Sequence, residues 1–93
     1  MTDSIETWLT LRYPEATLRK AFELVQDKAN WKNPIRKRVR AEDFVKIGIT
    51  ESWQDVVSEA IGFYAGSHTR ITFNAQNYTY LVEAQGYYMS VGA

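Results

Sequence analysis

Residues 53–64, WQDVVSEAIGFY, carry the clearest structural pattern in the chain. Their apolar residues recur at i, i+3, i+4, i+7, i+8 and i+11, which is the spacing of one face of an α-helix. Thr50 stands before the pattern as a capping residue, and Gly66 stops it. We therefore predict a helix here that forms the centre of the core. Its apolar positions are Trp53, Val56, Val57, Ala60, Ile61 and Tyr64.

The stretch that follows has the pattern of β-strands. Residues 69–74 alternate, with Ile71 and Phe73 on one face, and residues 78–84 are rich in β-branched and aromatic side chains. Residues 75–77 predict the hairpin connection, and Gly86 predicts a bulge or a turn. Residues 87–91 then either extend the second strand or form a third. Because helices precede this ribbon, parallel βαβ architectures are disfavoured.

The first half of the chain predicts more helices. A helix over residues 3–12 begins with a capping box and ends before Pro14, and a second helix covers residues 15–29. A third covers 41–47 and is closed by Gly48, with Ile49 as the apolar contact of a Schellman motif.

Residues 30–40 are predicted to be extended or irregular. As a strand, this segment would place Arg36, Arg38 and Arg40 on one face, and Ile35, Lys37 and Val39 on the other.

The predicted fold class is α+β. Three to four N-terminal helices pack on a C-terminal antiparallel ribbon of two to three strands, in one domain over residues 1–93. The chain has no cysteine, one histidine and a formal net charge of zero. Zinc sites of His and Cys are therefore excluded within one chain, and no global field favours nucleic acid or lipid. We expect a cytoplasmic protein without a targeting or membrane-spanning segment, and without a cofactor or metal.

The tyrosines of the ribbon are the leading candidates for partner binding. Strand alternation cannot place all of them on the core face. Tyrosine outside a core is a frequent interface residue, although ordinary strand propensity explains the same composition. The residues are Tyr78, Tyr80, Tyr87 and Tyr88.

An acidic stripe of Glu51, Asp55 and Glu59 lies four residues apart on the central helix. It is interpreted as a solvated face, or as a surface that docks on a basic partner. Glu83 in the second ribbon strand is interpreted as an edge charge that opposes aggregation.

A basic segment supports the alternative hypothesis of nucleic-acid binding. Arginines beside an aromatic ring supply phosphate pairing and a stacking platform. The neighbouring Glu42 and Asp43 could instead neutralise the segment internally. Its residues are Trp31, Lys32, Arg36, Lys37, Arg38 and Arg40.

Residues 45–50, VKIGIT, resemble the turn of a helix-turn-helix motif, and with the ribbon behind it the order would match a winged-helix domain. The outer face of the following helix argues against DNA reading, because it offers Glu51, Gln54, Asp55, Ser58 and Glu59 where phosphates would be repelled. The likeness is used as an architectural analogy only.

The functional prediction is a non-catalytic interaction module, an adaptor or stoichiometric inhibitor that binds a protein partner. Self-association is left open. The chain offers no general base with a positioned partner, and the adjacent Ser67 and His68 are interpreted as a polar turn rather than a catalytic dyad.

Overall fold

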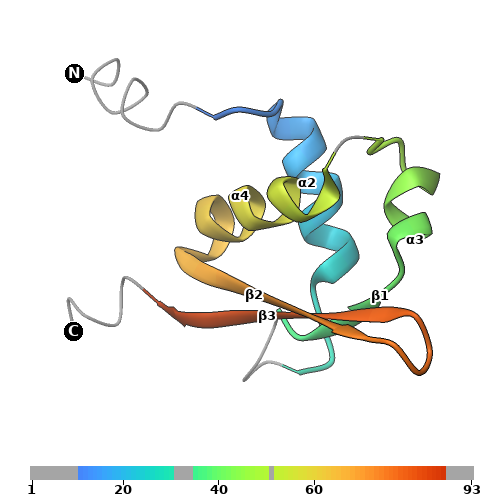
Figure 1. Cartoon of the computed structure of the whole chain (residues 1–93). Helices are drawn as coiled ribbons and strands as arrows, with labels where there is room; N and C mark the ends of the chain where they lie inside the picture. The colour runs from blue at the N-terminus through green and yellow to red at the C-terminus, as the bar shows by residue number, and fades with distance from the viewer. Residues whose placement is uncertain (1–10, 31–34, 51, 88–93) are drawn as a thin grey trace, which may run out of the picture.

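The computed structural model describes residues 11–30, 35–50 and 52–87 (Figure 1). Its elements, in chain order, are α2 (Glu15–Val25), β1 (Lys37–Val39), α3 (Ala41–Lys46), α4 (Trp53–Ala65), β2 (Ser67–Asn74) and β3 (Thr79–Tyr87). The predicted helix over residues 3–12 lies outside the described residues, except for Leu11 and Arg12, which are not helical.

The described helices lie on one side of a three-stranded antiparallel sheet, as Figure 1 shows. The strand order is β1-β3-β2, so β3 is the central strand. This arrangement confirms the α+β class. The predicted ribbon is the pair β2 and β3, and residues 37–39 supply a third strand.

The register of the sheet divides its side chains between two faces. Val82 of β3 lies opposite Lys37 and Ile71, and Tyr80 lies opposite Val39 and Phe73. Leu81, between them, lies opposite Arg38 and Thr72 and points to the other face. Val82 and Val39 are buried under the helices, whereas Arg38 and Thr72 are exposed. We call the second side the outer face of the sheet.

The bulge predicted at Gly86 is confirmed by the pairing of β2 with β3. Ser67 pairs with Tyr87 and His68 pairs with Gln85, so Gly86 is the additional residue in β3. Ser67 and His68 are therefore the first residues of a strand and not a turn, which corrects their interpretation from the sequence.

Both predicted glycine stops are confirmed. Gly48 has φ +92°, its amide donates to Val45, and the amide of Ile49 donates to the Phe44 carbonyl, which together make a Schellman motif. Gly66 ends α4 in the left-handed region with φ +60°. Both positions favour glycine, because the left-handed conformation strains residues that have a Cβ.

The second helix is shorter than predicted, because it ends at Val25 instead of Ala29. Gln26 is extended, and the Asp27 carboxylate accepts a hydrogen bond from the amide of Ala29 at 3.2 Å. The amide of Asn30 also donates to the Asp27 carbonyl. Asp27 thus gives the backbone a local turn that competes with helix.

The core is centred on α4, as predicted. Val56, Val57, Ala60 and Ile61 are fully or almost fully buried, and α4 contacts both α2 and β2. The other buried apolar residues come from every remaining described element except β2 and are Leu18, Ala21, Val25, Ile35, Val39, Phe44, Ile49 and Val82. Ile35 and Val39 confirm that residues 35–40 have an inward and an outward side.

Two glycine substitutions should change stability in opposite directions. A Cβ at Gly48 or at Gly62 would meet no atom within 4 Å, so only the backbone differs between the two sites. We expect Gly48→Ala to lower the free energy of unfolding by about 1 kcal/mol, because φ is positive there. Gly62→Ala lies inside α4 and should raise it by about 0.5–1 kcal/mol. Urea unfolding followed by tryptophan fluorescence measures both, and shifts of the same sign would contradict this account.

Candidate functional site

A column of aromatic rings runs from the core to the tip of the β2–β3 hairpin. Phe44 stacks on Trp53 at 4.4 Å between ring centroids, and Tyr80 meets Trp53 edge-on at 4.9 Å. Phe73 lies 4.9 Å from Tyr80 and 6.4 Å from Tyr78. Phe44 is fully buried, whereas Phe73 is 48% exposed and Tyr78 is 74% exposed. The column therefore connects two exposed rings to the rigid interior.

Tyr78 occupies the last position of the hairpin turn with φ +55°, a left-handed conformation. This conformation costs a residue with a side chain about 1–2 kcal/mol. The turn is held by two asparagines: Asn74 accepts from the amide of Gln76 at 3.0 Å, and Asn77 accepts from the Thr79 hydroxyl at 2.6 Å and its amide at 3.3 Å. The strain at Tyr78 is thus imposed by a defined turn.

A recess lies between the hairpin tip and the start of α3. Its volume is about 390 Å³, and it is lined by Arg40, Ala41, Glu42, Asn77 and Tyr78. Arg40 and Glu42 form an exposed ion pair at 3.4 Å. The Tyr78 ring and a charged pair therefore line one small hollow. We call Phe73, Tyr78, Asn77, Arg40 and Glu42 the hairpin-tip surface.

The structure separates the tyrosines that the sequence grouped together. Tyr78 is exposed in the turn, whereas Tyr80 packs against the core. Tyr87 ends β3, and Tyr88 lies outside the described residues. The sequence missed Phe73 as a surface residue because alternation placed it correctly on the inner face. Its position next to the hairpin connection was the available signal, since strand ends can extend past a core.

The two described residues of the acidic stripe, Asp55 and Glu59, differ in exposure. Glu51 lies outside the described part of the chain, and Asp55 is exposed. Glu59 is only 15% exposed in its side chain. One of its oxygens accepts from the amides of Arg12 and Tyr13 at 2.9 and 3.1 Å, and the other accepts from Arg12 Nε at 3.4 Å. Glu59 therefore anchors the segment that leads into α2.

The basic segment is also divided. Trp31 and Lys32 lie outside the described ranges, and Lys37 is exposed at the edge of the sheet. Arg40 pairs with Glu42, while its amide donates to the Asp43 carboxylate at 2.8 Å.

The other two basic residues are Arg36, which directly precedes β1, and Arg38, which lies in β1. Arg36 lies 3.7 Å from Glu83, and Arg38 is exposed. The sequence suggested that Glu42 and Asp43 neutralise the segment. Among the described residues of the segment, Arg40 is the one that they contact.

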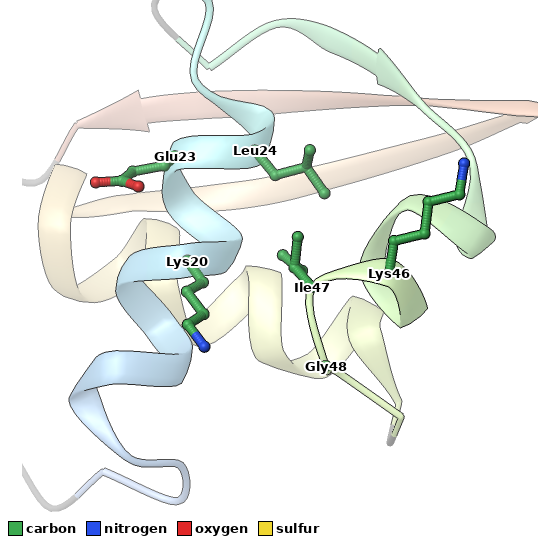
Figure 2. Close-up of a pocket in the computed structure, with 6 residues that line it drawn as sticks. All are labelled: Lys20, Glu23, Leu24, Lys46, Ile47 and Gly48. Carbon is green, nitrogen blue, oxygen red and sulfur yellow. The ribbon is translucent and has the colours of Figure 1, made fainter.

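A shallow groove of about 710 Å³ lies between α2 and the end of α3 (Figure 2). Leu24 and Ile47 approach each other across it, with Lys20 and Lys46 on opposite sides and Glu23 turned away. Close by on α2, the Arg19 guanidinium has its pKa raised by the Tyr64 hydroxyl and by Glu15, which keeps it charged. The groove holds apolar surface and ammonium groups, but no paired acid and base for proton transfer.

Within residues 11–30, 35–50 and 52–87, no three His, Asp or Glu side chains gather closely enough to hold a metal ion. The Ser67 hydroxyl is buried and donates to the carbonyl of His68 at 3.3 Å. No helix in the described ranges is long and apolar enough to cross a membrane.

Replacing Glu59 by Gln should destabilise the fold by about 1 kcal/mol. The carboxylate accepts two backbone N–H bonds and one from Arg12, and a neutral amide weakens all three. The matched control is Glu23→Gln, at an exposed α2 position, which should change the free energy of unfolding by less than about 0.5 kcal/mol. Thermal and urea unfolding test the pair, and equal effects would show that Glu59 is an ordinary surface charge.

Comparisons with known proteins supply no relative for this chain. No protein family, no curated protein and no solved structure matches it.

Proposed function

We propose that this protein is a non-catalytic interaction module, an adaptor or stoichiometric inhibitor, that binds a protein partner through the hairpin-tip surface. The observation that carries the proposal is Tyr78. Its ring is 74% exposed, although its backbone has φ +55°. Strained residues cluster at ligand clamps and binding sites, where the surrounding structure holds them in place.

The stability of the folded monomer does not account for the backbone strain at Tyr78. Asparagine or glycine would occupy the left-handed position at lower cost, and a ring that is mostly in solvent adds little hydrophobic stabilisation. A tyrosine at this position is therefore better explained by contact with another molecule than by the stability of the monomer.

The chemistry of the surface suits a protein partner. Tyr78 and Phe73 offer large rigid apolar area, and aromatic anchors of this kind dominate binding at protein interfaces. The Arg40–Glu42 pair supplies a polar rim beside them, and the recess of about 390 Å³ can receive a partner side chain. Phe73 packs on Tyr80, whose ring in turn meets Trp53, so the Phe73 side chain loses little conformational freedom on binding.

The test removes the ring without disturbing the fold. Tyr78→Asn should leave the free energy of unfolding unchanged or raise it by up to about 1 kcal/mol, because asparagine tolerates the left-handed region. The same substitution should weaken partner binding by at least roughly 30-fold, which corresponds to the ~2 kcal/mol typical of an aromatic hot spot. Tyr78→Phe keeps the ring and should retain binding.

The partner is identified by quantitative affinity capture from cells that contain this protein, and the affinity is then measured with purified components. Capture of the same proteins by the wild type and by Tyr78→Asn would overturn the proposal. Light scattering on the purified chain shows whether the captured partner is a second copy. Substitution of Tyr80 would be less informative, because its ring packs on Trp53 and unfolding would mask any loss of binding.

A further inference from the structure

The outer face of the sheet gathers arginines from two strands that are far apart in the sequence. Arg38 of β1 lies in one row with Leu81 and Thr72, and Arg70 of β2 lies opposite Glu83 in the neighbouring row. Arg36 reaches the same Glu83 at 3.7 Å. The described helices lie on the opposite side of the sheet, as Figure 1 shows.

The charge on this face is unbalanced. The face carries three exposed arginines and one carboxylate. That carboxylate belongs to Glu83, which lies beside Arg36 and Arg70 and has a side chain that is 24% exposed. Arg38 and Arg70 form no ion pair with another described residue. Since the whole chain has a formal net charge of zero, the excess of positive charge here is local.

We propose that the outer face of the sheet binds the phosphate backbone of a nucleic acid through Arg36, Arg38 and Arg70. This surface is separate from the hairpin-tip surface, and the proposal does not depend on the function proposed above.

The spacing of the arginines favours a polymer of phosphates over a single phosphate group. Arg36 and Arg38 are two residues apart, or about 7 Å along an extended chain, and Arg70 is two strands away, or about 10 Å. Each guanidinium can therefore take a separate phosphate with its planar fork of donors. The Thr72 hydroxyl is a further donor beside Arg38 in the sheet.

The composition of the two rows predicts binding without sequence preference. They contain no aromatic side chain on which a base could stack, and Leu81 is their one apolar residue. A lipid surface would need more apolar area to enter. Contacts to phosphate and sugar alone position a protein on nucleic acid but do not read its sequence.

The experiment is fluorescence anisotropy of a labelled 20-nucleotide single strand and of its duplex, titrated with the full chain at several salt concentrations. Three phosphate contacts predict a dissociation constant in the range of about 1–100 μM. Between 50 and 200 mM salt, the affinity should fall roughly 20-fold for the single strand and roughly 40-fold for the duplex. Arg38→Gln and Arg70→Gln should each lower the salt slope by about 0.7 to 0.9.

Two further variants make the test specific to this face. Glu83→Gln removes the one carboxylate and should tighten binding by about threefold at low salt. Arg19→Gln, the same change of charge on α2, is the control and should leave binding unchanged.

Failure to bind either oligonucleotide at 50 mM salt would overturn the proposal, as would equal losses for Arg19→Gln and Arg38→Gln. Binding to vesicles of anionic lipid or to polyglutamate, without binding to oligonucleotides, would assign the face to a different partner. Tyr78→Asn should bind oligonucleotides as the wild type does, so failure here is distinguishable from failure of the hairpin-tip surface.

Discussion

The packing of α4 between α2 and the sheet is the constraint on which the remaining features depend. Val57, Ala60 and Ile61 are fully buried, and the helix contacts α2 on one side and β2 on the other. A chain of 93 residues without cysteine relies on this single core for its stability, because no covalent cross-link limits the unfolded state. Each surface discussed above is held in place by an element that packs on α4 or on a strand beside it.

The same packing determines which parts of the sheet remain uncovered. The inner face is filled near Val82, but towards the hairpin the sheet extends past the core, so Tyr80 is partly buried and Phe73 is half exposed. Rings in this position are both accessible and supported from below. The outer face has no described helix on it and keeps its polar and charged side chains in solvent.

Charged side chains in this small domain hold parts of the fold together. Glu59 is used internally, because its carboxylate satisfies the amides of Arg12 and Tyr13 just before α2 begins. Arg40 and Glu42 pair locally. The arginines on the outer face differ, since among the described residues Arg36 pairs with Glu83, whereas Arg38 and Arg70 form no ion pair. A zero net charge therefore says little about local fields, and only the register of the strands shows where charge accumulates.

Local sequence determined much of the fold. The 3.6-residue period of residues 53–64, the glycine stops at Gly48 and Gly66 and the bulge at Gly86 depend on nearby residues, and each was predicted from them. At the candidate site the sequence indicated Tyr78 but grouped it with Tyr80, and it missed Phe73 and Arg70. Those outcomes required the tertiary structure, because exposure at a strand end depends on how far the helices reach. Arg70 joins Arg36 and Arg38 only through the pairing of β1 with β3, two strands that are about forty residues apart along the chain, and no local pattern encodes that register.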